Sequence, residues 1–159
     1  MANALATLDR PISTAPFGVS QQQFVTMRLG DQWFGLSVMN VQDVLRSLHV
    51  SRIPLAPSAV AGALNIRGRV VTAIDMRTRL NIGGECPADS MYVVVEYQQE
   101  LFALVVDAVG DVLTLSMRNF EAPPANLDGN WRGVAAGVFK LEKGLMVVID
   151  VIHVIDGIR

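Results

Sequence analysis

The sequence predicts a mostly β protein, in which two copies of a unit of about five short strands form two small barrels or a pair of curved sheets. Apolar and polar residues alternate along several short runs. Turn-forming residues separate these runs at intervals of about 8–12 residues, which is typical of all-β folds. The second half of the chain also repeats the pattern of the first. Closed barrels would leave few strand edges exposed to other chains.

Length and composition exclude several classes of protein. The chain has 159 residues, of which 51% are hydrophobic and 18% charged, so it can bury a core and is not a disordered chain. Its net charge of −2 gives no basic footprint, so we expect no binding to nucleic acid. No apolar run reaches the length of about 18 residues that spans a bilayer, so we expect no direct membrane insertion. The single cysteine, Cys86, excludes an internal disulfide, and the N-terminus shows no secretory leader, so we expect a cytoplasmic protein.

The first hairpin is predicted by alternation on both sides of a tight turn. Val25, Met27 and Leu29 alternate with polar residues, which indicates a strand. Gly30-Asp31 follows and suits a type II′ turn, because glycine comes first. The returning strand is marked by the alternating apolar residues Phe34, Leu36 and Val38.

A short helix is predicted next, because apolar residues take the spacing i, i+3, i+4 and i+7. These residues are Val41, Val44, Leu45 and Leu48. They would form one buried face, which leaves Val38 or Met39 available to contact a partner. The alternative is that all six apolar residues belong to the core. Pro54 and Pro57 then favour extended backbone and end the helix.

The remaining elements follow from turn residues and apolar runs. Arg67-Gly68 predicts a second tight hairpin between apolar segments. Residues 76–80 allow one or two helical turns, and residues 81–90 form a loop. Leu101 to Val106 is apolar at nearly every position, so we expect both faces of that strand to be buried. Gly137 suits a bent strand where two backbones approach closely.

An internal duplication relates the two halves of the chain. Residues 24–45 align with residues 92–113 without a gap, with eight identities in 22 positions. Ile74-Asp75 recurs as Ile149-Asp150, and each pair closes an apolar strand that follows a glycine-containing turn. Two copies with so long a period indicate a duplicated unit and not a solenoid.

No constellation of residues points to catalysis or to a cofactor. The sequence lacks a nucleophile elbow, a P-loop, a dinucleotide fingerprint and a zinc-protease motif. His49 and His153 are expected at the surface. Cys86 lies near Glu85 and Asp89, whose charges would raise the thiol pKa and make it a poor nucleophile. Five aspartates near strand and helix ends are expected to cap turns; they are Asp43, Asp75, Asp107, Asp111 and Asp150.

A set of motifs gives the chain a resemblance to a known family. In the first half they are Leu29-Gly30-Asp31, Phe34-Gly35-Leu36, Val41-Gln42-Asp43-Val44, Arg52-Ile53-Pro54, residues 62–68 (GALNIRG) and residues 70–77 (VVTAIDMR). In the second half they are residues 106–113 (VDAVGDVL) and 145–150 (LMVVID). Through these motifs the chain, from Gln22 to its end, resembles the CheW family of chemotaxis coupling proteins.

The resemblance implies a fold, a function and partners. The fold would be two intertwined five-stranded SH3-like β-barrels with short helices. The function would be that of a non-enzymatic adaptor without cofactors, which joins the cytoplasmic tip of chemoreceptors to the regulatory domain of the histidine kinase CheA. Other CheW-like domains in array rings are further possible partners, and the protein would be recruited to membrane-associated arrays.

The resemblance also implies a receptor-binding groove between the barrels. Its residues, carried over by motif, are Val38, Val41, Asp43, Gly62, Asn65 and Arg67. A contact between Asp43 and Arg67 is part of this expectation. The residues that would contact the kinase cannot be assigned from the sequence.

We further expect a flexible tail over residues 1–20 and a CheW-like domain over residues 21–159. This domain would contain pseudo-repeated subdomains at about 22–80 and 90–155, between which strands can be exchanged. Two other functions stay open. One is a CheW-like scaffold of another chemosensory array, for motility or surface sensing. The other is a small β-barrel enzyme or ligand-binding protein, which a deep pocket lined by Asp43, Asp75 or His49 would favour.

Overall fold

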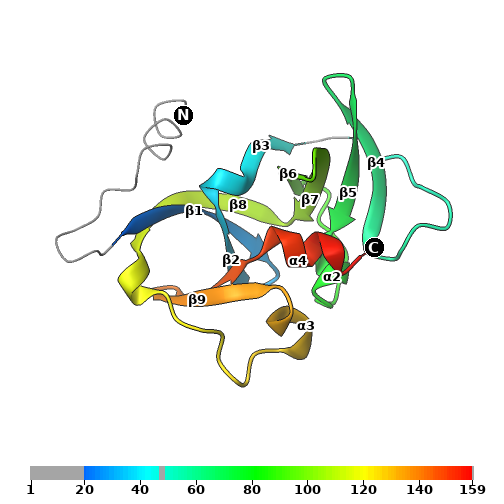
Figure 1. Cartoon of the computed structure of the whole chain (residues 1–159). Coiled ribbons are helices and arrows are strands. Elements are labelled where there is room, and N and C mark those ends of the chain that lie inside the picture. The colour runs from blue at the N-terminus through cyan, green and yellow to red at the C-terminus, as the bar shows by residue number, and fades with distance from the viewer. Residues whose placement is uncertain (1–19, 47–48, 159) are drawn as a thin grey trace.

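The computed structural model describes residues 20–46 and 49–158 (Figure 1). The expected flexible tail therefore lies outside the described residues, except for Ser20. The first half contains β1 (Gln21–Leu29), β2 (Gln32–Ser37), the 3-10 turn η1 (Val38–Asn40), β3 (Val41–Arg46), β4 (Val60–Ile66), β5 (Arg69–Asp75) and α2 (Met76–Arg79). The second half contains β6 (Met91–Tyr97), β7 (Glu100–Val106), β8 (Ala108–Ser116), η2 (Met117–Asn119), α3 (Gly129–Arg132), β9 (Ala135–Leu141), β10 (Gly144–Ile149) and α4 (Val151–Asp156).

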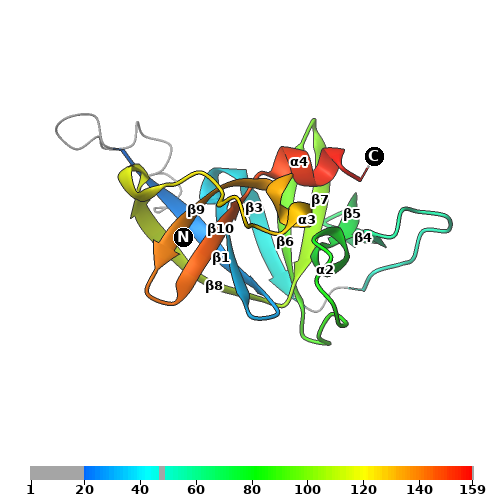
Figure 2. The ribbon, with the colours of Figure 1, turned by 90° about the horizontal axis from the view of Figure 1, so that it is seen from below.

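The strands form two five-stranded sheets that exchange strands between the two halves of the chain. The first sheet has the order β8-β1-β2-β10-β9, and the second has the order β3-β6-β7-β5-β4. Each sheet thus takes its first hairpin from one half and three strands from the other (Figures 1 and 2). Parallel pairs, β2 with β10 and β5 with β7, join the exchanged strands. The predicted fold class, mostly β with two intertwined five-stranded units that fit SH3-like barrels, is confirmed.

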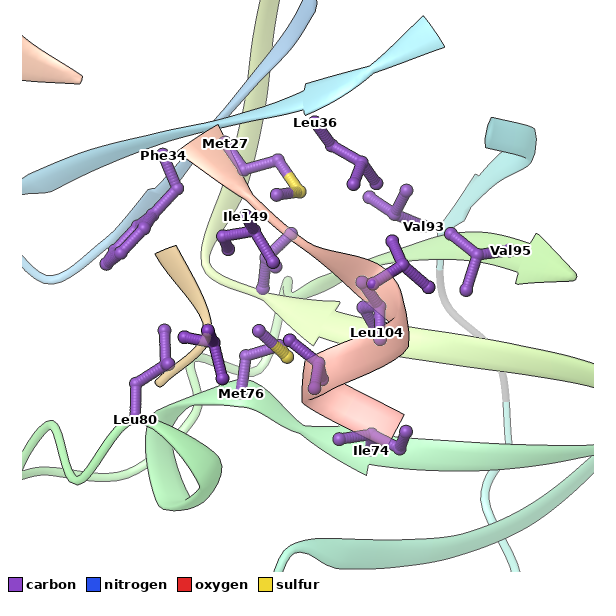
Figure 3. Packing of buried hydrophobic residues seen from close by; sticks show 14 of the residues in the cluster. Met27, Phe34, Leu36, Ile74, Met76, Leu80, Val93, Val95, Leu104 and Ile149 are labelled. Carbon is purple, nitrogen blue, oxygen red and sulfur yellow. The ribbon is translucent and has the colours of Figure 1, made fainter. Parts of the chain in front are cut away.

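Three apolar clusters fill the molecule, and the largest lies between the two sheets. It includes residues of both sheets, for example Phe34 from β2 and Leu104 from β7 (Figure 3). Leu64, Val71 and Val105 belong to the cluster of the second sheet, whereas Phe24 and Phe139 belong to that of the first. We call the first cluster the inter-barrel core. Its burial joins the two barrels through the hydrophobic effect, at roughly 25 cal/mol per Å² of apolar area.

Strand β7 shows why the sequence Leu101 to Val106 is almost wholly apolar. Alternate residues contribute to different clusters, with Phe102 and Leu104 in the inter-barrel core and Ala103 and Val105 in the cluster of the second sheet. The expectation that both faces are buried is therefore confirmed.

The prediction of a helix over residues 41–48 is wrong for those residues that the structure describes. Residues Val41–Arg46 form strand β3, which pairs with β6. A register shift between Val41 and Asp43 breaks the alternation of side chains along the strand. Val41 therefore packs against the inter-barrel core, and Leu45 packs against the cluster of the second sheet. Apolar residues at helical spacing thus belong to two faces of a bulged strand. Leu48 lies outside the described residues.

Both predicted hairpins are confirmed. Gly30 has φ of +60° in the turn between Leu29 and Gln32. Arg67 and Gly68 have φ of +52° and +84°, as a type I′ turn requires. The short helix α2 and the loop over residues 81–90 also occur where they were expected. Within the described part of the chain, no helix is long and apolar enough to cross a membrane.

Candidate functional site

Asp43 and Arg67 form the ion pair that the resemblance implied. Arg67 Nη2 lies 3.1 Å from Asp43 Oδ2. Asp43 lies on β3, and Arg67 lies at the tip of the β4–β5 hairpin, so the pair joins the two opposite edges of the second sheet. The Arg67 side chain is 80% exposed, and at that exposure the pair contributes only about 0.2–1 kcal/mol to stability. The guanidinium is therefore free to contact a partner.

Asn65 holds the turn that presents Arg67. Its Oδ1 accepts a hydrogen bond of 2.9 Å from the backbone N–H of Gly68. Asn65 also lines a surface hollow of about 410 Å³. The other residues of this hollow are His49, Ser51, Ala63, Leu64 and Val70. Because Val70 is 76% exposed, the hairpin combines an exposed cation with an apolar surface.

The other three predicted residues lie wholly or partly in the interior. Val38 is 8% exposed and belongs to the inter-barrel core, against which Val41 packs. Gly62 is buried with φ of +152°, and a Cβ there would collide with the backbone carbonyl of Ser51. Gly62 thus allows the chain before β4 to approach that strand, where Ser51 pairs with Ala63. The structure brings Asp43 and Arg67 together and places Asn65 on the same hairpin as Arg67, whereas Val38 lies in the inter-barrel core.

From the sequence, either Val38 or Met39 is left outside the core or both belong to it, and the structure distinguishes the two residues. Met39 is 59% exposed, whereas Val38 is buried. Both belong to η1, which leads directly into β3 and Asp43. Met39 is therefore the exposed apolar side chain of η1, and Val38 is part of the core.

A buried ion pair between Arg77 and Asp107 was missed by the sequence analysis. Arg77 donates from Nε to Asp107 Oδ1 at 2.9 Å and from Nη2 to Oδ2 at 2.5 Å. The side chains are only 13% and 4% exposed, respectively. Burial raises the pKa of Asp107, but the hydrogen bonds from Arg77 and from the Gly30 N–H outweigh it and lower the pKa overall. The one sequence signal was an aspartate directly after an uninterrupted apolar strand.

Asp75 and Asp150 act as the helix caps that were expected. Asp75 Oδ1 accepts from the N–H groups of Arg77 and Thr78, and Asp150 Oδ1 accepts from the N–H of Ile152. Asp107 accepts a hydrogen bond from the N–H of Gly30 in the β1–β2 turn, as expected of a turn cap, and in addition forms the buried pair with Arg77.

The Cys86 thiol is weakly acidic, as expected, but for a different reason. Burial, and after it the charge of Asp75, raises the pKa of Cys86 to about 11. Its Sγ lies 3.4 Å from Asp75 Oδ1. Glu85 and Asp89, which the sequence suggested as the cause, are exposed to solvent.

Two surface hollows bear on the alternative of an enzyme or ligand-binding protein, because Asp75 lines one and His49 lines the other. A hollow of about 670 Å³ lies under the exposed loop of residues 52–58, where Asp75 and Arg52 contribute polar groups. The oxygens of Asp75 already accept hydrogen bonds from its own helix. His49 lines a different hollow and is exposed. Over the described ranges, no group of three or more His, Cys, Asp or Glu side chains is placed to hold a metal ion.

Comparison with known proteins gives a consistent result. A family model described as "CheW-like domain" matches residues 23–159. The chemotaxis protein CheW of Rhizobium meliloti (strain 1021) is 28% identical over 130 residues, which are 81% of this chain and 84% of that protein. The chemotaxis protein CheW of Helicobacter pylori is 23% identical over 158 residues and 95% of each chain. The crystal structure of the scaffolding protein TtCheW from Thermoanaerobacter tengcongensis superposes with a TM-score of 0.74 at 27% identity, over 80% of this chain and 88% of that one.

Proposed function

The chain belongs to the CheW-like domain family of chemotaxis scaffold proteins, and on that basis we propose that it is a non-enzymatic adaptor between chemoreceptors and the histidine kinase CheA. Its partners are the cytoplasmic tip of the receptor and the regulatory domain of the kinase, with other CheW-like domains as further neighbours in array rings. It acts in the cytoplasm and is recruited there to membrane-associated arrays.

The observation that carries this proposal is the Arg67–Asp43 pair, which joins the tip of the β4–β5 hairpin to β3. Val70 on the same hairpin and Met39 in η1 are exposed apolar side chains. This combination suits an amphipathic receptor helix, because such a helix carries apolar side chains along one face and polar groups at the borders of that face. We assign direct receptor contacts to Asp43, Asn65 and Arg67, and a supporting role beneath them to Val38, Val41 and Gly62.

An adaptor of this kind works by holding two partners at once. When both bind one rigid body, the effective concentration of the kinase at the receptor rises without a new contact between them. Each contact can then be of roughly micromolar affinity, or about −8 kcal/mol.

Reconstitution tests the proposed function. A receptor cytoplasmic fragment and CheA are mixed with and without this protein, and autophosphorylation of the kinase is measured. We expect stimulation only when the protein is present. Equal kinase activity without it would contradict the proposal, and so would catalytic turnover by the isolated chain.

Replacing Arg67 by alanine separates recognition from stability. Because the Arg67 side chain is 80% exposed, we expect Arg67→Ala to keep the melting temperature within a few degrees. A guanidinium desolvated at an interface is worth about 1.4 kcal/mol or more, so receptor binding should weaken about tenfold or more. Titration calorimetry with the receptor fragment measures the affinity.

The matched control is Arg69→Ala, which removes an exposed arginine two residues further along the same hairpin. A double-mutant cycle with Asp43→Ala should give a coupling of about 0.5 kcal/mol or more in receptor binding. Unchanged affinity of Arg67→Ala would remove the residue from the site, and additive losses would leave two independent contacts.

A further inference from the structure

The chain crosses between the two barrels at two places in the described residues. The first crossing is η1, between β2 of one sheet and β3 of the other. The second crossing is a single residue, Asp107, because β7 ends at Val106 in the second sheet and β8 begins at Ala108 in the first. In the duplicated alignment Asp107 corresponds to Met39 in η1, so the two crossings are equivalent positions of the two copies.

At the second crossing, both the backbone and the side chain of Asp107 form hydrogen bonds. The backbone N–H of Asp107 donates to the carbonyl of Arg28 on β1 at 3.0 Å. Its carboxylate accepts two bonds from Arg77 on α2, at 2.9 and 2.5 Å, and one of 2.8 Å from the N–H of Gly30. Arg77 Nη1 also donates to the carbonyl of Gly83 at 2.5 Å. One buried carboxylate therefore joins the β1–β2 turn of the first barrel to the helix of the second.

Helix α2 and the following Leu80 make further contacts, with helices α4 and α3. Arg79 donates from Nε and Nη2 to the carbonyls of Val154 and His153 near the end of α4, which follows β10. The carbonyl of Leu80 accepts a bond of 2.8 Å from Trp131 Nε1, and the Trp131 ring packs edge-on against Phe34 at 5.3 Å. These contacts surround the inter-barrel core, in which Leu80 is fully buried (Figure 3).

Polar and apolar contacts constrain the barrels differently. The close-packed inter-barrel core already restricts how the barrels meet, but its individual apolar contacts are non-directional. A bidentate arginine–carboxylate pair requires one planar geometry. Buried ion pairs add little net stability compared with apolar pairs of similar volume. We therefore attribute to this pair a role in directional positioning and not in net stability.

We propose that Arg77 and Asp107 are positioning residues that fix the angle between the two barrels at the Asp107 crossing. They act on function through this angle, because the adaptor must hold two partners in one geometry. The functional half of this inference rests on the proposed adaptor function. The geometric half, a fixed inter-barrel angle, does not depend on it.

The test compares the wild type with Arg77→Met/Asp107→Leu, which replaces the pair by apolar side chains of similar size. The control Glu121→Leu/Lys140→Met makes the same kind of change at an exposed pair, whose side chains are 50% and 76% exposed. Residual dipolar couplings of backbone amides are fitted separately for the two sheets. We expect one alignment tensor to describe both sheets in the wild type and the control, and two different tensors in the Arg77/Asp107 variant.

The functional readout separates positioning from folding. For the folded Arg77/Asp107 variant, the affinity for receptor fragment alone and for kinase alone should stay within about threefold, whereas stimulation of the kinase in the ternary mixture should fall about tenfold. One shared tensor with unchanged stimulation would overturn the inference.

If the double variant does not fold, Arg77→Lys serves instead, since lysine keeps the charge but loses the bidentate geometry. A single alignment tensor for Arg77→Lys would also overturn the inference. Absence of stimulation by the wild type would contradict the adaptor function, while the couplings would still decide the geometric half.

Discussion

Asp107→Ala should lower the free energy of unfolding by about 3–5 kcal/mol, because it leaves the Arg77 guanidinium in the interior without its counter-charge. It also leaves the N–H of Gly30 without the acceptor that it has in the wild type. For a domain of this size the melting temperature should fall by on the order of 10 °C. Urea denaturation followed by circular dichroism measures the loss.

The matched control is Asp111→Ala, on β8 of the same crossing, where the residue is exposed. Surface substitutions of this kind usually change stability by no more than about 0.5 kcal/mol. A loss below about 1 kcal/mol for Asp107→Ala would show that water or rearrangement satisfies Arg77, and would contradict a buried pair.

The contribution of this pair should also depend on pH. The pKa of Asp107 is lowered in the folded protein, since the hydrogen bonds from Arg77 and Gly30 outweigh the effect of burial. Its stabilisation is therefore complete above the unfolded-state pKa of about 3.9 and is lost as pH falls through the lower folded-state value. The stability difference between wild type and Asp107→Ala should consequently narrow below about pH 4. A difference that stays constant down to acid pH would exclude the pair as its source.

Short-range features of this fold could be predicted from the sequence because local residues determine them. The turn at Gly30 depends on a glycine that adopts positive φ, and the caps of α2 and α4 depend on Asp75 and Asp150. The duplication likewise indicated the matching order of strands in the two halves. These features need no knowledge of how distant segments meet.

Long-range features could not be derived in the same way. The parallel pairing of β2 with β10 joins residues more than 100 positions apart, for example Trp33 with Met146. No local pattern marks such a partner, and the exchange of strands came only from the family resemblance. The error at β3 has the same origin, because pairing with β6 and a bulge overrode the helical spacing.

The same distinction between short-range and long-range features applies to the candidate site. The pairing of Asp43 with Arg67 was correct, yet it came from resemblance and not from spacing. The Arg77–Asp107 pair escaped notice because its members are 30 residues apart and only the folded chain brings them together. Val38 was expected at the surface as one alternative, although its burial depends on packing between two barrels.

Val38→Glu should prevent folding or lower the free energy of unfolding by about 4 kcal/mol or more, because it places a carboxylate in the inter-barrel core. Val38 is 8% exposed and lies in η1, at the first crossing between the barrels. The carboxylate would have to stay protonated at neutral pH or draw water into the core, and either costs stability. Met39→Glu is the matched control: it introduces the same charge one residue away, where the side chain is 59% exposed. That variant should remain folded by circular dichroism and lose affinity for the receptor fragment, since Met39 is the exposed apolar residue of η1. A stable Val38→Glu variant would show that Val38 is not part of the core. Full receptor affinity of Met39→Glu would show that η1 is not part of the binding site.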